Sequence, residues 1–332
     1  MKRFLLLVAG FVAVLLLVMW LPLVLIPDTL LQGDLARLSA TPFRYTRAAA
    51  DTTVPRAHCV DVWAGRMIPR KAMGTRRVAV FGDSFSIAAK IWPDSSRWHQ
   101  YMGGQTGQTV VCVSTVRDCS MSVFLSYLTH HREMLPDTVF VESVERNVVD
   151  RLCGLDFEHV PDIEAYYDLS DSVKESVNWI GKSRNLCRAL LHIDNQVLSV
   201  KLDRALFSCR PDMLYCVFQD TVHPKKEDIV RAIANYRTLD SLASAKGVTM
   251  YFVPIPDKFT VYRPYVVDEA YRNKYCLLED SAFCNRMHNM INPLTVLREL
   301  VERGETDVFH PDDTHFSPIG AKAVGLYVLQ RL

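Results

Sequence analysis

The sequence has no excess of either charge and no cysteine pair with metal-binding spacing. Its 332 residues include 38 Lys and Arg against 37 Asp and Glu, a formal net charge of +1. Nucleic-acid binding depends on cationic contacts to phosphates, so this balance gives it little support. None of the nine cysteines forms a C-x-x-C motif, which argues against a zinc ribbon or a thioredoxin-type site.

A long uncharged run is present at the N-terminus. Leu5 to Ile26 contains no charged residue and follows Lys2 and Arg3. At 1.5 Å per residue the run would form a helix of about 33 Å, enough to cross the hydrocarbon core of a membrane. The alternative is a cleaved signal peptide, whose apolar core is shorter, roughly 7–15 residues, and ends at small residues. Bulky residues and prolines follow here, so we predict an uncleaved anchor.

The anchor sets the domain organisation and the location. We predict a transmembrane anchor over 1–26, a juxtamembrane linker over 27–53 and one folded domain over 54–332. Basic residues before the span keep its N-terminus in the cytoplasm. The domain is then expected to face the periplasm or the outside, held in the inner (cytoplasmic) membrane by a single pass.

Cysteine usage fits such an oxidising compartment. Three pairs are close in sequence and could form disulfides that close small loops: Cys112/Cys119, Cys209/Cys216 and Cys276/Cys284. Three more cysteines remain, so at least one thiol is unpaired or intermolecular.

A strand-to-helix turn places a serine in a chemically useful position. Val78–Phe81 reads as a short buried strand, Gly82 and Asp83 break it, and helical spacing starts at Phe85. Ser84 would then lie at a helix N-terminus, where free N–H groups can hold an oxyanion. The alternative is that Ser84 is only a helix N-cap.

A loop near the C-terminus supplies the groups that a serine nucleophile needs. Asp312, Asp313 and His315 lie together just before a final helical segment. A histidine can act as the base for Ser84, and a carboxylate fixes its tautomer. A metal cluster formed by His310, Asp312, Asp313 and His315 is the rival interpretation, but no second ligand group with metal spacing occurs elsewhere. We therefore predict no metal.

The two motifs together resemble the SGNH (GDSL-like) hydrolase superfamily. Further segments resemble the SGNH domains of alginate O-acetyltransferases of the AlgX/AlgJ type: the P-x-P-x-K…Y pattern within Tyr251–Tyr262, the E-x-x-E-R pattern within Glu142–Asn147, and Asp313–Pro318, similar to a D-T-H-W motif with Phe in place of Trp. In those proteins D-T-H-W usually precedes GDSF, whereas here it follows. The order leaves the subfamily and the polymer open.

Alternating apolar strands and amphipathic helices predict an α/β fold, a three-layer SGNH/flavodoxin-like parallel sheet with helices on both faces. The expected strands are Val78–Phe81, Thr109–Val113, Thr138–Val141, Thr249–Val253 and Asp307–Phe309. The expected helices are Ser120–His131, Ile163–Lys201, Lys226–Lys246 and Leu294–Arg303. Ligands bind beyond the carboxyl ends of such strands, where both Ser84 and Glu142 are expected.

The predicted site follows from these motifs and the resemblance. Ser84 is the nucleophile, His315 the base, and Asp313 or Asp312 the orienting acid, with Asp313 favoured. Gly82, Asp83, Arg146 and Asn147 are expected to form the oxyanion and substrate region; the resemblance favours Arg146 over Asn147 as the residue that faces the site. A solvated Glu145–Arg146 pair is the alternative. Lys258 and Tyr262 are expected to line the cleft or hold its loop.

The resemblance implies an extracytoplasmic polysaccharide O-acetyltransferase that works through an acyl-serine. Acetyl-CoA does not reach that compartment, so it also implies a membrane partner, such as an MBOAT-type acyltransferase, that delivers the acyl group. No cofactor is expected. Two alternatives stay open: a carbohydrate esterase with the same triad, and a catalytically silent polysaccharide-binding assembly factor.

Overall fold

The structure is a computed structural model. It describes residues 2–25, 55–63, 66–68, 77–87, 97–104, 107, 109–114, 120–166, 197–201, 212–216, 224–305, 308–309 and 314–332.

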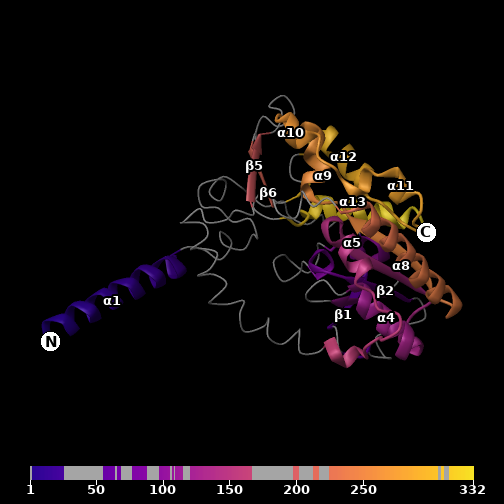
Figure 1. Ribbon diagram of the computed structural model, residues 1–332, viewed down its shortest axis with the longest axis horizontal. Helices are drawn as coiled ribbons and strands as arrows, with labels where there is room; N and C mark the ends of the chain where they lie inside the picture. Colours follow the sequence, from indigo (N-terminus) through magenta and orange to yellow (C-terminus); the bar gives the residue numbers. More distant parts are fainter. Residues whose placement is uncertain are drawn as a thin grey trace.

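A five-stranded sheet of parallel strands forms the centre of the domain (Figure 1). Its strands are β1 (His58–Trp63), β2 (Arg77–Gly82), β3 (Thr109–Ser114), β4 (Thr138–Val144) and β7 (Thr249–Ile255), in the spatial order β1-β3-β2-β4-β7. The valine- and phenylalanine-rich middles of β2, β3 and β4 are buried. Burial on both faces explains why these strands lack polar alternation.

The strand order reverses direction around β2. The chain leaves β2 for β3 on one side and later returns to β4 on the other side. In register, Phe81 lies opposite both Val113 and Val141, so Gly82 and Glu142 are level on neighbouring strands. In open α/β sheets, ligands bind at the carboxyl ends of the strands flanking such a reversal. The residues that follow β2 occupy that position.

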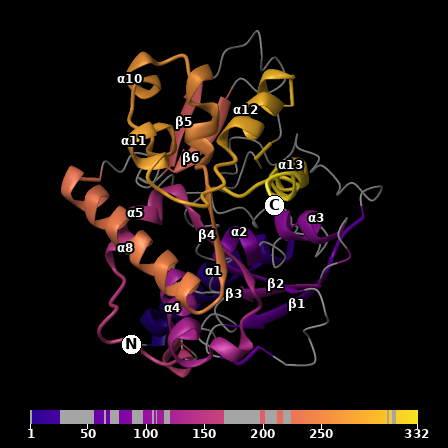
Figure 2. The same cartoon turned by 90° about the vertical axis from the view of Figure 1, so that its right-hand side faces the viewer.

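Helices cover both faces of the sheet (Figure 2). On one face, α4 (Ser120–His130), α5 (Glu145–Cys153) and α8 (Lys226–Ala245) pack on β2, β4 and β7. On the other face, α2 (Ser84–Ile87) and α3 (Trp98–Gly104) pack on β2, β3 and β1, and α13 (Pro318–Leu329) packs on α3. Gly325 of α13 permits this contact, because a Cβ there would lie 2.8 Å from the Tyr101 Cβ.

Shorter elements complete the described part of the chain: η4 (Arg132–Met134), η5 (Ile163–Tyr166), α9 (Lys258–Tyr262), η6 (Arg263–Tyr265), α10 (Glu269–Arg272), η7 (Leu277–Glu279), α11 (Ser281–Cys284) and α12 (Leu294–Glu302). A separate antiparallel pair consists of β5 (Val197–Lys201) and β6 (Asp212–Cys216).

The N-terminal run forms α1 (Lys2–Leu25), and the side chains described for it, over 2–17, are exposed. Within the described parts of the chain, no helix has the length and hydropathy needed to cross a membrane. The anchor over 1–26 therefore stays a prediction, as do the linker and domain boundaries.

Most of the expected strands and helices are confirmed, with three corrections. The strand β4 continues through Val144, so Glu142 lies inside it rather than after it. Of the helix expected over Ile163–Lys201, the first residues form the short 3-10 helix η5, 167–196 lie outside the described residues, and the end is wrong because 197–201 form the strand β5. Phe309 forms only an isolated bridge with Phe316 in place of the expected strand. The sheet edge β1 was not expected from the sequence at all.

The disulfide prediction is wrong where the structure tests it. Cys276 and Cys284 both carry thiols. Cys284 instead directs its sulfur toward the Leu278 carbonyl at 3.5 Å. Cys119 lies outside the described residues, so the pair Cys112/Cys119 stays a prediction. The pair Cys209/Cys216 lies outside the residues whose side chains are described.

Candidate active site

The turn after β2 presents a single hydroxyl to solvent. Gly82 ends the strand, and Ser84 begins α2 with an exposed side chain. Its neighbours Asp83, Phe85 and Ser86 are buried. The Ser86 N–H donates to the Asp83 carbonyl at 3.0 Å, which closes the turn. The local fold thus separates one exposed serine from three buried residues that fix its backbone.

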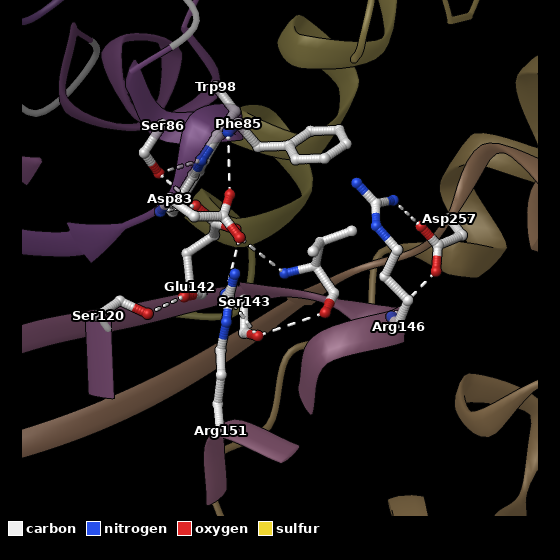
Figure 3. Close-up of polar contacts among 11 residues, drawn as sticks. Asp83, Phe85, Ser86, Trp98, Ser120, Glu142, Ser143, Arg146, Arg151 and Asp257 are labelled. Carbon is white, nitrogen blue, oxygen red and sulfur yellow. Dashed lines mark hydrogen bonds and ion pairs between the residues drawn. The ribbon is translucent and has the colours of Figure 1, made fainter. Parts of the chain in front are cut away.

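The buried Asp83 carboxylate points toward the backbone of Phe85 and the guanidinium of Arg151 (Figure 3). It accepts hydrogen bonds from the Phe85 N–H at 3.0 Å, from the Val144 N–H at 3.2 Å and from Arg151 Nη1 at 2.7 Å. Burial opposes its ionisation, but the charge of Arg151 and these donors lower the pKa of Asp83. The geometry thus supports an internal, turn-holding role for Asp83, in place of the expected substrate contact.

A second buried carboxyl group lies behind the same turn. Glu142 Oε2 accepts hydrogen bonds from the Asp83 N–H at 2.9 Å and from Ser86 Oγ at 2.8 Å. Burial, the negative charge of Asp83 and a hydrogen bond between the two carboxyl groups raise the pKa of Glu142 well above its ordinary value. Of the two carboxyl groups, Glu142 is therefore the one on which a proton is favoured.

His315 packs directly against the serine turn. Its ring centroid lies 4.7 Å from that of Phe85, the residue after Ser84. Phe316 packs on the same Phe85 ring at 5.0 Å and on Phe309 at 5.0 Å. These aromatic contacts bring a segment more than two hundred residues away in sequence to the proposed nucleophile.

The His315 segment is anchored on both sides. The Ser317 N–H donates to the Val308 carbonyl at 3.0 Å, and Ser317 Oγ caps α13 by accepting from the Ile319 N–H at 3.1 Å. A Cβ on Gly320 would collide with the Val308 carbonyl, so this close approach requires glycine there. His310, Asp312 and Asp313 lie outside the described residues, and the acid of the triad stays a prediction.

Arg146 and Glu145 do not form the solvated pair that was the alternative interpretation. Arg146 forms a buried ion pair with Asp257, whose carboxylate also accepts from the Arg146 N–H at 2.9 Å. Glu145 instead accepts from the Asp257 N–H at 3.1 Å and the Leu278 N–H at 3.0 Å. Burial and the charge of Asp257 raise the pKa of Glu145 to about 7.

A small cavity of about 60 Å³ lies beside this cluster. Glu145, Arg146 and Asp257 border it, together with Thr260 and Cys276. Arg146 is thus both ion-paired and at the wall of a cavity.

The remaining predicted residues lie close to these groups in the fold. Asn147 follows Arg146 on α5 and is half-buried. Lys258 and Tyr262 lie on α9 and are buried, and the Tyr262 ring packs on Phe309 at 6.1 Å. Tyr262 therefore supports the His315 segment through Phe309.

Within the described parts of the chain, no three His, Cys, Asp or Glu side chains are grouped as a metal ion requires. The alternative metal cluster proposed from the sequence cannot be compared with this result. Three of its four residues lie outside the described parts: His310, Asp312 and Asp313.

Sequence reasoning missed residues whose partners are distant in the chain. Arg151 and Asp257 each form a buried ion pair with a site residue, and Trp98 Nε1 donates to Ser86 Oγ at 3.2 Å. The sequence indicates Glu142 only as part of a motif. The available signal is a charged residue within a largely apolar segment, because a carboxyl group is rarely buried without a partner.

Comparisons with known proteins leave the family open. No family model matches the sequence, and no curated protein matches it. A solved structure of a G-D-S-L family protein from Desulfitobacterium hafniense DCB-2 aligns with 78% of this chain and 100% of its own, at 11% identity and a TM-score of 0.38. At that TM-score the similarity is too low to establish a common fold. The α/β architecture described above rests on strand order and register.

Proposed function

We propose that this chain is an SGNH-type O-acyltransferase that moves acetyl groups onto hydroxyls of an extracytoplasmic polysaccharide. The observation that supports the proposal most directly is the exposed Ser84 at the carboxyl end of β2, with the His315 ring packed against the next residue. An exposed nucleophile beside a histidine, at the point where the strand order reverses, is the arrangement that acyl transfer uses.

The proposed reaction has two halves. Ser84 Oγ attacks the carbonyl carbon of an acyl ester while His315 takes the hydroxyl proton, and the tetrahedral intermediate collapses to acetyl-Ser84 as the proton passes to the leaving group. An acceptor hydroxyl then gives its proton to His315 and attacks the acetyl-serine. The acetyl group leaves on the acceptor, and Ser84 recovers its proton.

Arg146 is proposed as the polar group nearest to the developing negative charge, with Asn147 as the alternative donor. Asp313, or else Asp312, would orient the imidazole of His315. In this proposal α1 anchors the chain in the inner membrane, the domain faces the periplasm, and a membrane acyltransferase of the MBOAT type supplies the acetyl group.

The test is acylation of Ser84 by an activated acetyl ester. Intact-mass measurements on the full chain in detergent should show one added acetyl group in the parent and none in Ser84→Ala. Deacylation should be faster with an added oligosaccharide than in buffer. Equal deacylation rates with and without a range of glycans would indicate an esterase, and absence of acetyl-Ser84 would favour the non-catalytic assembly factor.

The same assay separates the two candidate acids. Loss of the orienting carboxylate can cost on the order of 10⁴ in turnover. We expect that loss in Asp313→Asn and a much smaller one in Asp312→Asn. The reverse ranking would assign the role to Asp312.

A further inference from the structure

Glu142 contacts the backbone on one side of Ser84 and a side chain on the other. Its Oε2 accepts from the N–H of Asp83, immediately before Ser84, and from the hydroxyl of Ser86, two residues after it. Figure 3 shows these groups converging at the start of α2. One carboxyl group on the neighbouring strand therefore holds both flanks of the proposed nucleophile.

The surroundings leave Glu142 little freedom to move. A Cβ on Gly82 would overlap Ser86 Oγ and lie 2.7 Å from Glu142 Oε2, so the absence of a side chain on Gly82 makes room for this contact. Trp98 Nε1 donates to Ser86 Oγ at 3.2 Å. Ser120 Oγ donates to the Glu142 carbonyl at 3.0 Å. The hydroxyl of Ser86 thus donates to Glu142 and accepts from Trp98, and its orientation is fixed.

The donors are divided unequally between the two carboxyl groups. Asp83 receives two backbone N–H groups and the Arg151 guanidinium. No donor among the described residues reaches Glu142 Oε1. In a buried site, a carboxylate with three hydrogen-bond donors, one of them cationic, is stabilised far better than a carboxylate with an oxygen that receives no donor. The negative charge is therefore favoured on Asp83 over Glu142. The proton shared by this pair belongs on Glu142.

We propose that Glu142 is a neutral carboxylic acid that positions the Ser84 turn, with its protonated oxygen donating to Asp83 and its carbonyl oxygen accepting from both flanks of Ser84. The inference rests on the proposed function and deepens it. Ionised Glu142 would place a second negative charge beside Asp83, behind the atom where the oxyanion develops. Two adjacent negative charges would oppose ionisation of both Asp83 and Glu142, and they would also oppose formation of the oxyanion.

The other groups around Glu142 leave this assignment intact. Arg151 is the cation that faces the pair, and it bonds Asp83 and Ser143 Oγ. From α3, His99 stacks at the edge of Trp98 at 5.5 Å, and burial together with Arg97 lowers the pKa of His99 to about 3, so it is uncharged. From β3, the Cys112 thiol contacts the Ser86 carbonyl at 3.8 Å.

The test compares Glu142→Gln with Glu142→Ala in the full chain. Glutamine is neutral and reproduces the pattern, because its carbonyl can accept from Asp83 N–H and Ser86 Oγ while its amide donates to Asp83. We expect Ser84 acylation by the activated ester to fall by about 10- to 100-fold in Glu142→Ala, since a misplaced nucleophile costs that much. In Glu142→Gln the rate of Ser84 acylation should lie within about threefold of the parent rate. Raising the pH into the alkaline range should lower this rate less in Glu142→Gln than in the parent.

Glu145→Gln is the matched control. Both oxygens of Glu145 accept from backbone N–H groups, so a side-chain amide there would face a donor rather than an acceptor. Its failure to mimic the parent would show that rescue at Glu142 is specific to a group that donates. If Glu142→Gln is as impaired as Glu142→Ala, or if it leaves the alkaline limb unchanged, the proposal is overturned.

A readout that needs no catalysis separates this proposal from the proposed function. The infrared difference spectrum of parent minus Glu142→Gln at neutral pH should contain the C=O stretch of a protonated carboxylic acid. Absence of that band would overturn the inference even if Ser84 is acylated. If Ser84 is never acylated, the proposed function fails. The inference about Glu142 is then tested by the infrared band and by thermal unfolding at a series of pH values. At alkaline pH, Glu142→Gln should flatten the dependence of stability on pH, and Glu145→Gln should not.

Discussion

Two clusters at the end of β4 use the same residue types for different purposes. Asp83 and Arg151 form a buried ion pair with Glu142 beside them, and Asp257 and Arg146 form another with Glu145 beside them. The first pair is enclosed and holds the Ser84 turn. The second borders a cavity of about 60 Å³ and can be reached by a small ligand or water. Burial of an ion pair therefore does not by itself distinguish a structural cluster from a site.

The glutamates differ in their partners more than in their burial. Glu142 lies against the Asp83 carboxyl group, a serine hydroxyl and a backbone N–H. Glu145 accepts two backbone N–H groups from separate segments, the start of α9 and η7. Hydrogen bonds to Glu145 tie α5 to the loops around the cavity, whereas those to Glu142 fix the turn. The variants below separate these roles.

The largest effect is expected where a buried charge loses its cation. Arg151→Met leaves Asp83 enclosed without a counter-charge, and such a loss costs about 3–5 kcal/mol of unfolding free energy. Arg146→Met leaves Asp257 beside a cavity that water can enter, so we expect a smaller loss, about 1–3 kcal/mol. Urea unfolding of both variants would measure the difference. Equal losses of unfolding free energy would show that the cavity does not reduce the cost of leaving Asp257 without a cation.

The second prediction concerns the pH dependence of stability. The pKa of Glu145 is raised to about 7 in the folded protein from an ordinary value of 4.5. Over that interval the folded state keeps a proton that the unfolded chain releases. The contribution of Glu145 to the unfolding free energy therefore falls by about 3 kcal/mol as pH rises from 4.5 to about 7, and is constant above about pH 7.

Glu142 adds a fall of the same sign that extends to higher pH. Glu145→Gln and Glu142→Gln should therefore each reduce the slope of the profile between about pH 4.5 and 7, and Glu142→Gln should go on reducing the slope at higher pH. Urea unfolding at a series of pH values would show which part each variant removes. If Glu142→Gln removes no slope beyond the interval that Glu145→Gln affects, the two carboxyl groups titrate over the same range and the comparison breaks down.

The third prediction tests how tightly the Ser84 turn is packed. Gly82→Ala pushes a methyl group into Ser86 and Glu142, and overpacking of this kind costs about 1–3 kcal/mol. Ser84 acylation should fall with it. Gly154→Ala is the control, since its Cβ would lie 3.2 Å from the Asp150 carbonyl, a tight contact that a shift of a few tenths of an ångström relieves, whereas a Cβ on Gly82 would overlap Ser86 Oγ. Thermal unfolding of the control should stay within about 1 kcal/mol of the parent, and a Gly82→Ala protein of parental stability would disprove the close packing.

The sheet could be predicted from sequence because its strands are locally distinctive. The apolar runs at Val78–Phe81, Thr109–Val113 and Thr138–Val141 need no knowledge of their neighbours. The edge strand β1 was not predicted, since polar residues at His58 and Asp61 interrupt its apolar run, and Asp61 pairs with Arg97. Edge strands carry a weaker apolar signal because one side has no neighbour.

The site was only partly predictable for a related reason. Short sequence motifs indicate Ser84 and His315, and the contact of the His315 ring with Phe85 places His315 next to the Ser84 turn. Arg151 and Asp257 carry no local signal, because their role comes from partners 68 and 111 residues away. The resemblance indicated Glu142 and Glu145 by spacing, but only packing shows that the first is enclosed and the second borders a cavity.

The smallest effect is expected at the thiols beside the cavity. Cys276 borders the cavity beside Glu145, and Cys284 is the last residue of α11. Neither cysteine forms a disulfide. Burial and the charge of Glu145 raise the pKa of Cys276 to about 12, so its reactive thiolate is scarce at neutral pH. The folded protein should react slowly with iodoacetamide at Cys276, and a reductant should leave its unfolding free energy unchanged.

A disulfide between these residues would stabilise the fold by about 2–4 kcal/mol, so the measurement is decisive in either direction. In urea without reductant, both cysteines should take up the label, which peptide mass spectrometry detects. Labelling that requires prior reduction would establish the bond that the sequence spacing first suggested. The cavity wall would then be cross-linked next to Glu145, while the Ser84 turn would depend on hydrogen bonds and packing alone.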